Sequence, residues 1–156
     1  MATKEFQFLP VSIDIRNRKI LIIGGGRVGY HKALILNRFT NEATVISKTF
    51  HEGFANLPFH LKQKEYEIND LQGAWMIYIC TENHALNAHI KQDAERLHIL
   101  ASVCDNPELC DFISPAVYKN GDLTISVSSN AKDVRRSIRI RNAIRDAIEK
   151  GDLSMD

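Results

Sequence analysis

The stretch that decides how this chain folds is Lys19-Ile-Leu-Ile-Ile-Gly24-Gly-Gly-Arg-Val-Gly29. Its first five residues form a short apolar run rich in β-branched side chains, which predicts a strand buried on both faces. Three consecutive glycines follow, and apolar residues at helical spacing then continue to about Asn41. A buried strand, a glycine turn and a helix in this order predict the first βα unit of a parallel sheet.

The alternation of strand and helix continues beyond this unit. Further strands are predicted over residues 43–46, 59–66, 74–79 and 99–103, and a helix over residues 84–97. Strands that alternate with helices are typical of a Rossmann-type, doubly wound parallel sheet, so we expect an α/β fold.

The pattern changes after Asp105, where Asn106-Pro107 and Ser114-Pro115 are typical of loops. Two strand-like runs then flank Asn120-Gly121, a dipeptide that favours a tight β-hairpin. Residues 131–150 predict a long helix.

Two domains follow from this change of pattern. We expect a nucleotide-type Rossmann domain over residues 1–113 and a small α+β segment, a hairpin plus a helix, over residues 114–156. The small segment cannot bury its own apolar stripe. We therefore expect it to pair with a second copy and form a homodimer.

Composition and charge exclude several classes of protein. The 156 residues are 44% hydrophobic and 25% charged, which argues against disorder and low complexity. A net charge of +1 and the lack of a long apolar run predict neither a nucleic-acid partner nor a membrane span. Residues 131–150 carry seven Lys or Arg and three Asp or Glu, but without the aromatic residues or helix-turn-helix spacing of a nucleic-acid binder.

The N-terminus and the cysteines indicate a cytoplasmic location. Met1 to Pro10 has no long apolar run and does not resemble a signal peptide. The three cysteines are Cys80, Cys104 and Cys110, an odd number without a C-x-x-C pair. This argues against a disulfide framework and a zinc site, so we expect buried thiols in a reducing compartment and no metal site.

The glycine turn has the spacing G-x-G-x-x-G of a dinucleotide-binding loop. Gly24 permits the tight turn, Gly26 leaves the backbone open to a pyrophosphate, and Gly29 lets the helix approach the strand. The N–H groups at the start of the helix favour phosphate. The candidate cofactor-binding residues of this loop are Gly24, Gly25, Gly26, Arg27, Val28 and Gly29.

The ends of two later strands supply further candidates for cofactor binding. The acidic residue that usually binds a ribose hydroxyl after the second strand is missing, and Ser47-Lys48 stands there instead. Ser47 could bind the ribose, whereas Lys48 could meet the extra phosphate of NADP, so these residues leave the choice between NAD and NADP open. Thr81 follows the fourth strand and could contact the cofactor or cap the next helix.

Asp105 follows the fifth strand, at the edge of the sheet where ligands of this fold bind. A carboxylate there could act as a general base or orient a cationic substrate nitrogen. By themselves, the residues Asp105-Asn106-Pro107 favour a turn in which the carboxylate only bonds the backbone.

Five blocks of the sequence resemble the precorrin-2 dehydrogenase family, which forms the dehydrogenase part of siroheme synthases. The blocks are Phe8-Leu-Pro-Val11, Lys19 to Lys32, Thr81-Glu-Asn83 with Leu86-Asn87, Val103-Cys-Asp105-Asn-Pro107 with Asp111-Phe-Ile-Ser-Pro-Ala116, and Gly121-Asp-Leu-Thr-Ile-Ser-Val-Ser128 with the Arg-rich helix. Their order and spacing carry the resemblance, which covers most of residues 6–149.

The resemblance implies an NAD-dependent oxidoreductase that converts precorrin-2, a reduced tetrapyrrole, into sirohydrochlorin in siroheme biosynthesis. It implies a catalytic role for Asp105 and a cofactor contact for Thr81. Arg side chains suit the carboxylates of such a substrate. The expected substrate-binding residues are Asn87, Ser128, Arg141 and Arg145.

Two alternatives to this function remain open. The first is a bifunctional protein that also inserts ferrous iron, as some members of the family do. The second is a regulator that binds a nucleotide or tetrapyrrole without catalysis. The second alternative is left open by two features. One is Lys48, and the other is the stretch 129–134, which lacks the glycine and proline common in the family at this point.

Overall fold

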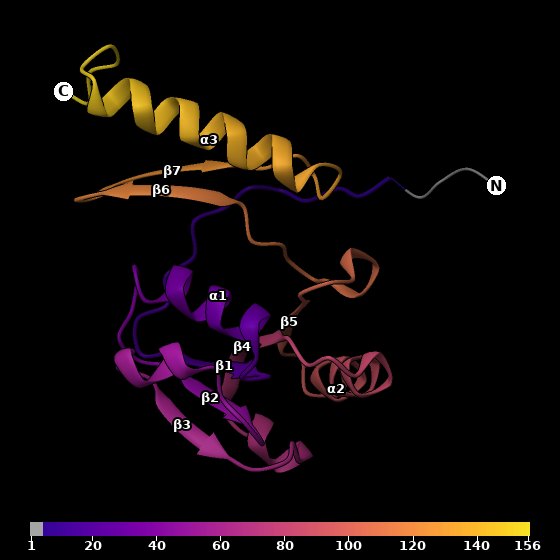
Figure 1. Cartoon of the computed structure of the whole chain (residues 1–156). Helices are drawn as coiled ribbons and strands as arrows, with labels where there is room; N and C mark the ends of the chain where they lie inside the picture. Colours follow the sequence, from indigo (N-terminus) through magenta and orange to yellow (C-terminus); the bar gives the residue numbers. More distant parts are fainter. Residues whose placement is uncertain (1–4) are drawn as a thin grey trace. The chain divides into compact units, whose positions relative to one another are not determined.

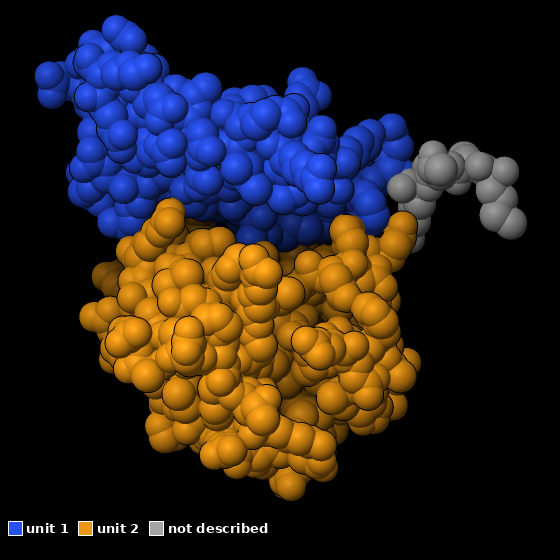
Figure 2. All heavy atoms as spheres, in the orientation of Figure 1, with its two compact units in different colours: residues 1–11, 113–156 blue, residues 12–112 orange. Residues whose placement is uncertain are grey.

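The computed structural model describes residues 5–156 and divides them into two units (Figure 2). One unit is Ser12–Phe112. The other joins the N-terminal segment up to Val11 with Ile113–Asp156. Among the residues from 5 onward, no helix is long and apolar enough to span a bilayer.

The unit Ser12–Phe112 is built on a five-stranded sheet in which every strand pair is parallel (Figure 1). Its strands are β1 (Lys19–Ile23), β2 (Thr44–Ser47), β3 (His60–Gln63), β4 (Ala74–Ile79) and β5 (Leu100–Val103), in the order β3-β2-β1-β4-β5. Its helices are α1 (Arg27–Leu36) and α2 (His84–Arg96), with short 3-10 helices η1 (Glu52–Asn56), η2 (Ile68–Leu71) and η3 (Pro107–Leu109). This order confirms the predicted Rossmann-type sheet.

The two helices cover opposite faces of the sheet, because alternate residues of β1 enter two different apolar clusters. Ile22 packs in one cluster with Ala33 of α1. Its neighbour Ile23 packs in the other with Ile90 of α2. All four side chains are buried, so the unbroken apolar run of β1 is explained by burial on both faces.

Two helices are shorter than the sequence predicts. α1 ends at Leu36 rather than near Asn41, because the chain tightens there and the Phe39 N–H bonds the carbonyl of Leu36. In the other unit, α3 (Val134–Glu149) begins three residues after the predicted start. Asn130 and Ala131 have positive φ angles of 55° and 61°, which no helix can contain.

A buried lysine holds the loop that follows β5. The Lys91 ammonium on α2 lies 2.7 Å from the Asp111 carboxylate and 3.1 Å from that of Glu95. The second oxygen of Asp111 accepts the Ala101 N–H at 2.9 Å. Burial opposes the charge of Lys91, but these hydrogen bonds outweigh it and raise its pKa. The loop containing Asp105 is therefore tied to both α2 and β5.

The smaller unit contains the predicted hairpin, β6 (Ala116–Asn120) and β7 (Leu123–Val127), with α3 packed along both strands (Figure 1). The observed boundary at Ile113 lies one residue from the predicted one. The assignment of residues 5–11 to the Rossmann domain differs from the structure, which groups them with the smaller unit. Phe8 donates its N–H to Asn130 Oδ1 at 2.9 Å, and the Asn130 amide donates to the Phe6 carbonyl, so this segment belongs with the smaller unit.

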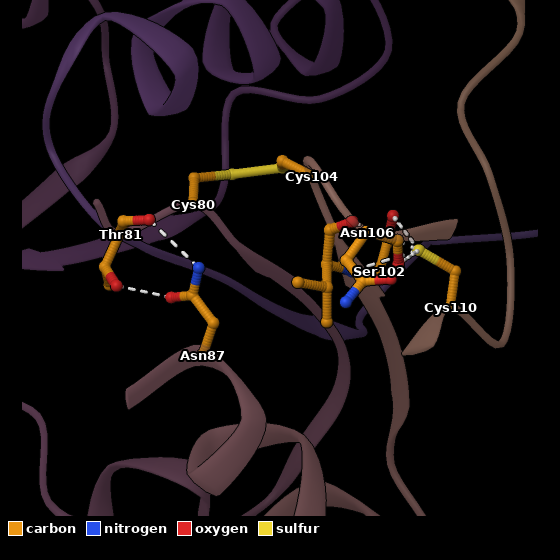
Figure 3. Close-up of a disulfide and its surroundings, with 8 residues drawn as sticks. Cys80, Thr81, Asn87, Ser102, Cys104, Asn106 and Cys110 are labelled. Carbon is orange, nitrogen blue, oxygen red and sulfur yellow. Dashed lines mark hydrogen bonds between the residues drawn. A yellow bond between two sulfur atoms is a disulfide. The ribbon is translucent and has the colours of Figure 1, made fainter. Parts of the chain in front are cut away.

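The expectation of three thiols was also wrong, because Cys80 and Cys104 form a disulfide (Figure 3). They follow the paired residues Ile79 of β4 and Val103 of β5, and their Cα atoms are 5.4 Å apart. An odd cysteine count contains no information about which strand ends lie side by side. Cys110 stays free, and its Sγ lies 3.2 Å from both the N and the O of Val103.

The disulfide gives a first prediction. Without reductant, thiol titration of the unfolded chain should find one thiol, that of Cys110, and three after reduction. Because the bond closes a loop with a sequence separation of 24, reduction should lower the free energy of unfolding by about 3 kcal/mol. Denaturant unfolding with and without reductant measures this difference.

The double variant Cys80→Ser/Cys104→Ser is the control, since its stability should not respond to reductant. Three reactive thiols in the protein purified without reductant would contradict the prediction.

Candidate active site

The candidate site lies along the edge of the sheet formed by the carboxyl ends of the strands. The strand order reverses between β1 and β4, which are paired neighbours. In open α/β sheets, ligands bind outside the carboxyl ends of the strands at such a switch point. The glycine loop follows β1 at this place, and Thr81 and Asp105 follow β4 and β5 along the same edge.

The turn from β1 to α1 leaves no room for side chains at Gly24 and Gly29. Gly24 has φ +116°, and a Cβ atom there would lie 2.5 Å from the carbonyl carbon of Cys80. A Cβ atom on Gly29 would collide with the carbonyl oxygen of Gly24. These two contacts support the predicted roles of a tight turn and of close helix packing.

Gly25 is buried against the segment that follows β2. A Cβ atom at Gly25 would lie 2.7 Å from the Phe50 ring and 2.8 Å from Ser47 Cβ. The His51 N–H also donates to the Gly25 carbonyl at 2.7 Å, and the His51 ring stacks on Tyr30 of α1. The sequence analysis did not identify this support, since nothing local to residues 50 and 51 indicates that they reach the glycine loop.

Gly26 differs from the other glycines of the loop because it is exposed and has open space where a Cβ atom would be. It is the N-cap residue of α1, and no side chain caps this helix. Arg27 and Val28, the next two residues, are exposed as well. The loop therefore offers bare backbone N–H groups at a helix N-terminus, which fits the pyrophosphate of a dinucleotide.

At the end of β2, Ser47 is half-buried and Lys48 is exposed. The Lys48 ammonium forms an ion pair with the carboxylate of Glu65, which follows β3. The interaction lowers the pKa of Glu65. The sequence analysis singled out both Ser47 and Lys48 but missed Glu65.

Thr81 is held by a buried amide (Figure 3). The Asn87 side chain on α2 is 2% exposed, donates to the Thr81 carbonyl at 2.9 Å, and contacts the Thr81 hydroxyl through Oδ1. The cap of α2 is Asn83, whose side chain accepts the Leu86 N–H at 3.0 Å. Thr81 is therefore not the capping residue, and Asn87 lies beneath Thr81 rather than on an exposed surface.

Asp105 is half exposed, and its carboxylate lies 3.2 Å from Nδ1 of His84, the first residue of α2. The turn at this point is closed by the backbone, since Asn106 N–H donates to the Val103 carbonyl at 3.1 Å. The carboxylate of Asp105 is thus presented at the edge of the sheet beside an imidazole. The sequence analysis did not single out His84, because only the tertiary structure brings it to Asp105.

The remaining predicted residues lie in the smaller unit. Arg141 donates to the Val117 carbonyl at 2.8 Å, which ties α3 to β6. Arg145 donates to Asp146 at 2.9 Å, and Ser128 is exposed after β7. Each unit therefore contributes its own set of candidate residues, with the cofactor candidates and Asp105 all in Ser12–Phe112.

The structure also bears on a metal site and on cavities away from these candidates. Within residues 5–156, no group of three or more His, Cys, Asp or Glu side chains is placed to hold a metal ion. A hollow of about 470 Å³ opens at the amino ends of β1, β2 and β3, lined by residues such as Lys19, Thr44 and His60. It is at the opposite edge of the sheet from the glycine loop.

Comparison with known proteins agrees with this geometry. Residues 11–116 match a family described as "Putative NAD(P)-binding". Siroheme synthase of Vesicomyosocius okutanii is 31% identical over 129 residues, which are 80% of this chain and 28% of that protein. Siroheme synthase of Psychrobacter arcticus is 35% identical over 127 residues, 79% of this chain and 23% of that protein. The chain thus spans about a quarter of the length of these relatives.

A solved structure has the same fold. SirC, a precorrin-2 dehydrogenase, superposes with a TM-score of 0.75 at 22% identity, covering 89% of this chain and 70% of its own. The family match includes the glycine loop and the strand ends that carry Lys48, Thr81 and Asp105. On this match, which spans well over half of the chain, the protein belongs to the NAD(P)-binding family.

Proposed function

We propose that this protein is an NAD-dependent precorrin-2 dehydrogenase, which oxidises precorrin-2 to sirohydrochlorin in siroheme biosynthesis. The observation that carries the proposal is the open backbone at Gly26 with Asp105 on the same edge of the sheet. The resemblance to siroheme synthases and to a precorrin-2 dehydrogenase supplies the substrate class.

The loop from Gly24 to Gly29 binds the pyrophosphate of the cofactor in this proposal. The first-turn N–H groups of α1 point toward the anion, and the exposed Gly26 lets it approach. Ser47 and Lys48 lie at the end of β2, where the ribose of a dinucleotide binds in this fold. When bound there, the cofactor would supply a nicotinamide as the acceptor of a hydride from the substrate.

The residues of the sheet edge then position the substrate. Asn87 holds Thr81 at the end of β4, so the backbone there is fixed before the ligands bind. Asp105 accepts the proton that the substrate loses together with the hydride, or it orients a ring nitrogen of the tetrapyrrole. Ser128, Arg141 and Arg145 are the candidates for the substrate carboxylates, which suit guanidinium groups.

We also propose a homodimer in the cytoplasm. The dimer is supported by the exposed apolar side chains of the smaller unit. Val134 and Ile138 lie one helical turn apart on α3 and are 66% and 39% exposed. Leu9 and Val11, in the segment that joins this unit, are 81% and 65% exposed. A second copy that covers such side chains would remove them from water.

The function is tested by anaerobic spectrophotometry with precorrin-2 and NAD or NADP. We expect sirohydrochlorin to form with NAD, and Asp105→Asn to lower kcat about 100-fold because it loses the carboxylate at the edge. Calorimetric NAD binding should be unchanged in this variant, since the proposed role of Asp105 is toward the substrate and not toward the pyrophosphate.

Each other outcome of this assay has a distinct meaning. Full turnover in Asp105→Asn would mean that Asp105 has no role in catalysis beyond forming the turn. Iron-dependent formation of siroheme would indicate the bifunctional alternative. Tight tetrapyrrole binding without turnover with either cofactor would contradict the proposal and favour a regulator.

The glycine loop allows a test that separates binding from folding. Gly26→Ala places a methyl group in open space, so the melting temperature should stay that of the wild type. The same methyl group would obstruct the pyrophosphate, and we expect NAD affinity to fall at least about tenfold. Gly24→Ala should instead lower the melting temperature, because its Cβ collides with Cys80. Unchanged NAD affinity in Gly26→Ala would contradict the assigned role.

The dimer is tested by light scattering coupled to size exclusion. The wild type should have twice the chain mass of 17.7 kDa, and Val134→Asp/Ile138→Asp should be monomeric because it buries charge in the interface. Leu97→Asp is the control, since Leu97 is a comparably exposed apolar residue at the end of α2 in the other unit. A monomeric wild type at micromolar concentration would contradict the proposal.

A further inference from the structure

The second strand ends without the acidic residue that dinucleotide-binding folds usually place there. In such folds a carboxylate at this point accepts a hydrogen bond from a ribose hydroxyl of NAD. Here Ser47 and Lys48 occupy the end of β2, and neither supplies a negative charge. The local sequence by itself leaves the cofactor preference undecided.

The neighbouring strand brings a carboxylate to this place. β3 pairs with β2 in parallel, and its last residue, Gln63, stands opposite Ser47. The Gln63 amide donates to the Lys48 carbonyl at 3.0 Å, and the Lys64 N–H donates to the Ser47 carbonyl at 3.0 Å. Two carbonyls at the β2 terminus are therefore bonded to the chain that leads directly into Glu65.

The Glu65 carboxylate is held at the β2 terminus by the Lys48 ammonium. The pair is formed by one oxygen of the carboxylate, Oε1, and a carboxylate can accept hydrogen bonds on both oxygens. Both side chains are about 70% exposed, so a ligand can reach them.

From these contacts we infer that Glu65 replaces the missing acidic residue of β2 and makes this protein select NAD over NADP. Its carboxylate accepts a hydrogen bond from the ribose hydroxyl of NAD and repels the 2′-phosphate that NADP carries in that position. The inference rests on the proposed cofactor site, and it deepens that proposal by naming the residue that determines specificity.

The charge of Lys48 explains why Glu65 is needed. An unpaired lysine at the end of β2 would attract the 2′-phosphate, which is doubly negative near neutral pH. Glu65 offsets the positive charge of this lysine, and its carboxylate repels the 2′-phosphate. Discrimination therefore combines an attractive contact for one cofactor with repulsion of the other.

The experiment measures the dissociation constants of NAD and NADP by calorimetry, with no tetrapyrrole present. In Glu65→Gln, the ratio of the two constants should move at least about tenfold toward NADP, since Lys48 is then unpaired. In Lys48→Gln/Glu65→Gln, the gain in NADP affinity should disappear, because no cation is left to meet the phosphate. Raising the ionic strength should weaken the gain, as expected for exposed charges.

Glu67→Gln is the matched control. Glu67 is an exposed glutamate two residues further along the same segment, and it pairs with Lys64 rather than Lys48. Its substitution changes the net charge by the same amount and should leave the ratio of dissociation constants within twofold of the wild type.

Two results would overturn the inference while leaving the proposed function intact. One is a ratio in Glu65→Gln that stays within twofold of the wild type, and the other is an equal change in Glu67→Gln. NAD binding without turnover of precorrin-2 would defeat the proposed function alone. Failure of the wild type to bind either dinucleotide would overturn both.

Discussion

The contact on which the rest of this site depends is the packing of bare backbone between β1 and α1. A side chain at Gly24 would meet the carbonyl of Cys80, and a side chain at Gly29 would meet the carbonyl of Gly24. Because neither side chain is present, α1 begins directly at the switch point of the sheet. Its first N–H groups then stand where a dinucleotide phosphate binds in this fold. Any bulk at these two positions would push the helix away from the switch point.

The other candidate groups are exposed at the edge but supported by buried polar side chains from neighbouring elements. Asn87 of α2 lies beneath Thr81, and Lys91 of the same helix holds Asp111 in the loop after Asp105. Buried amides and ammonium groups are costly without partners, so these fully bonded contacts also specify one arrangement of the loops. α2 thus serves as a common support for the ends of β4 and β5, which the disulfide Cys80–Cys104 joins directly.

Charge along the same edge is arranged in pairs. Lys48 is matched by Glu65, and Asp105 is matched by the imidazole of His84. In both pairs one partner was visible as a candidate in the sequence, and the other comes from a different strand or helix. For Lys48 and Glu65, the net charge of the pair is therefore smaller than that of either residue alone. At the proposed ribose site, the pairing with Glu65 would oppose the preference of Lys48 alone for an additional phosphate.

The amino-acid sequence by itself determined the βα unit of residues 19–29, the parallel sheet, the hairpin and the basic helix. These features depend on hydrophobic periodicity and on the conformations that glycine permits, both of which are local properties. Only the tertiary structure decided that Cys80 meets Cys104, that Glu65 reaches Lys48, and that the segment up to Val11 joins the smaller unit. Such neighbours depend on strand order and register, which bring together residues far apart in the chain, and no local pattern encodes that adjacency.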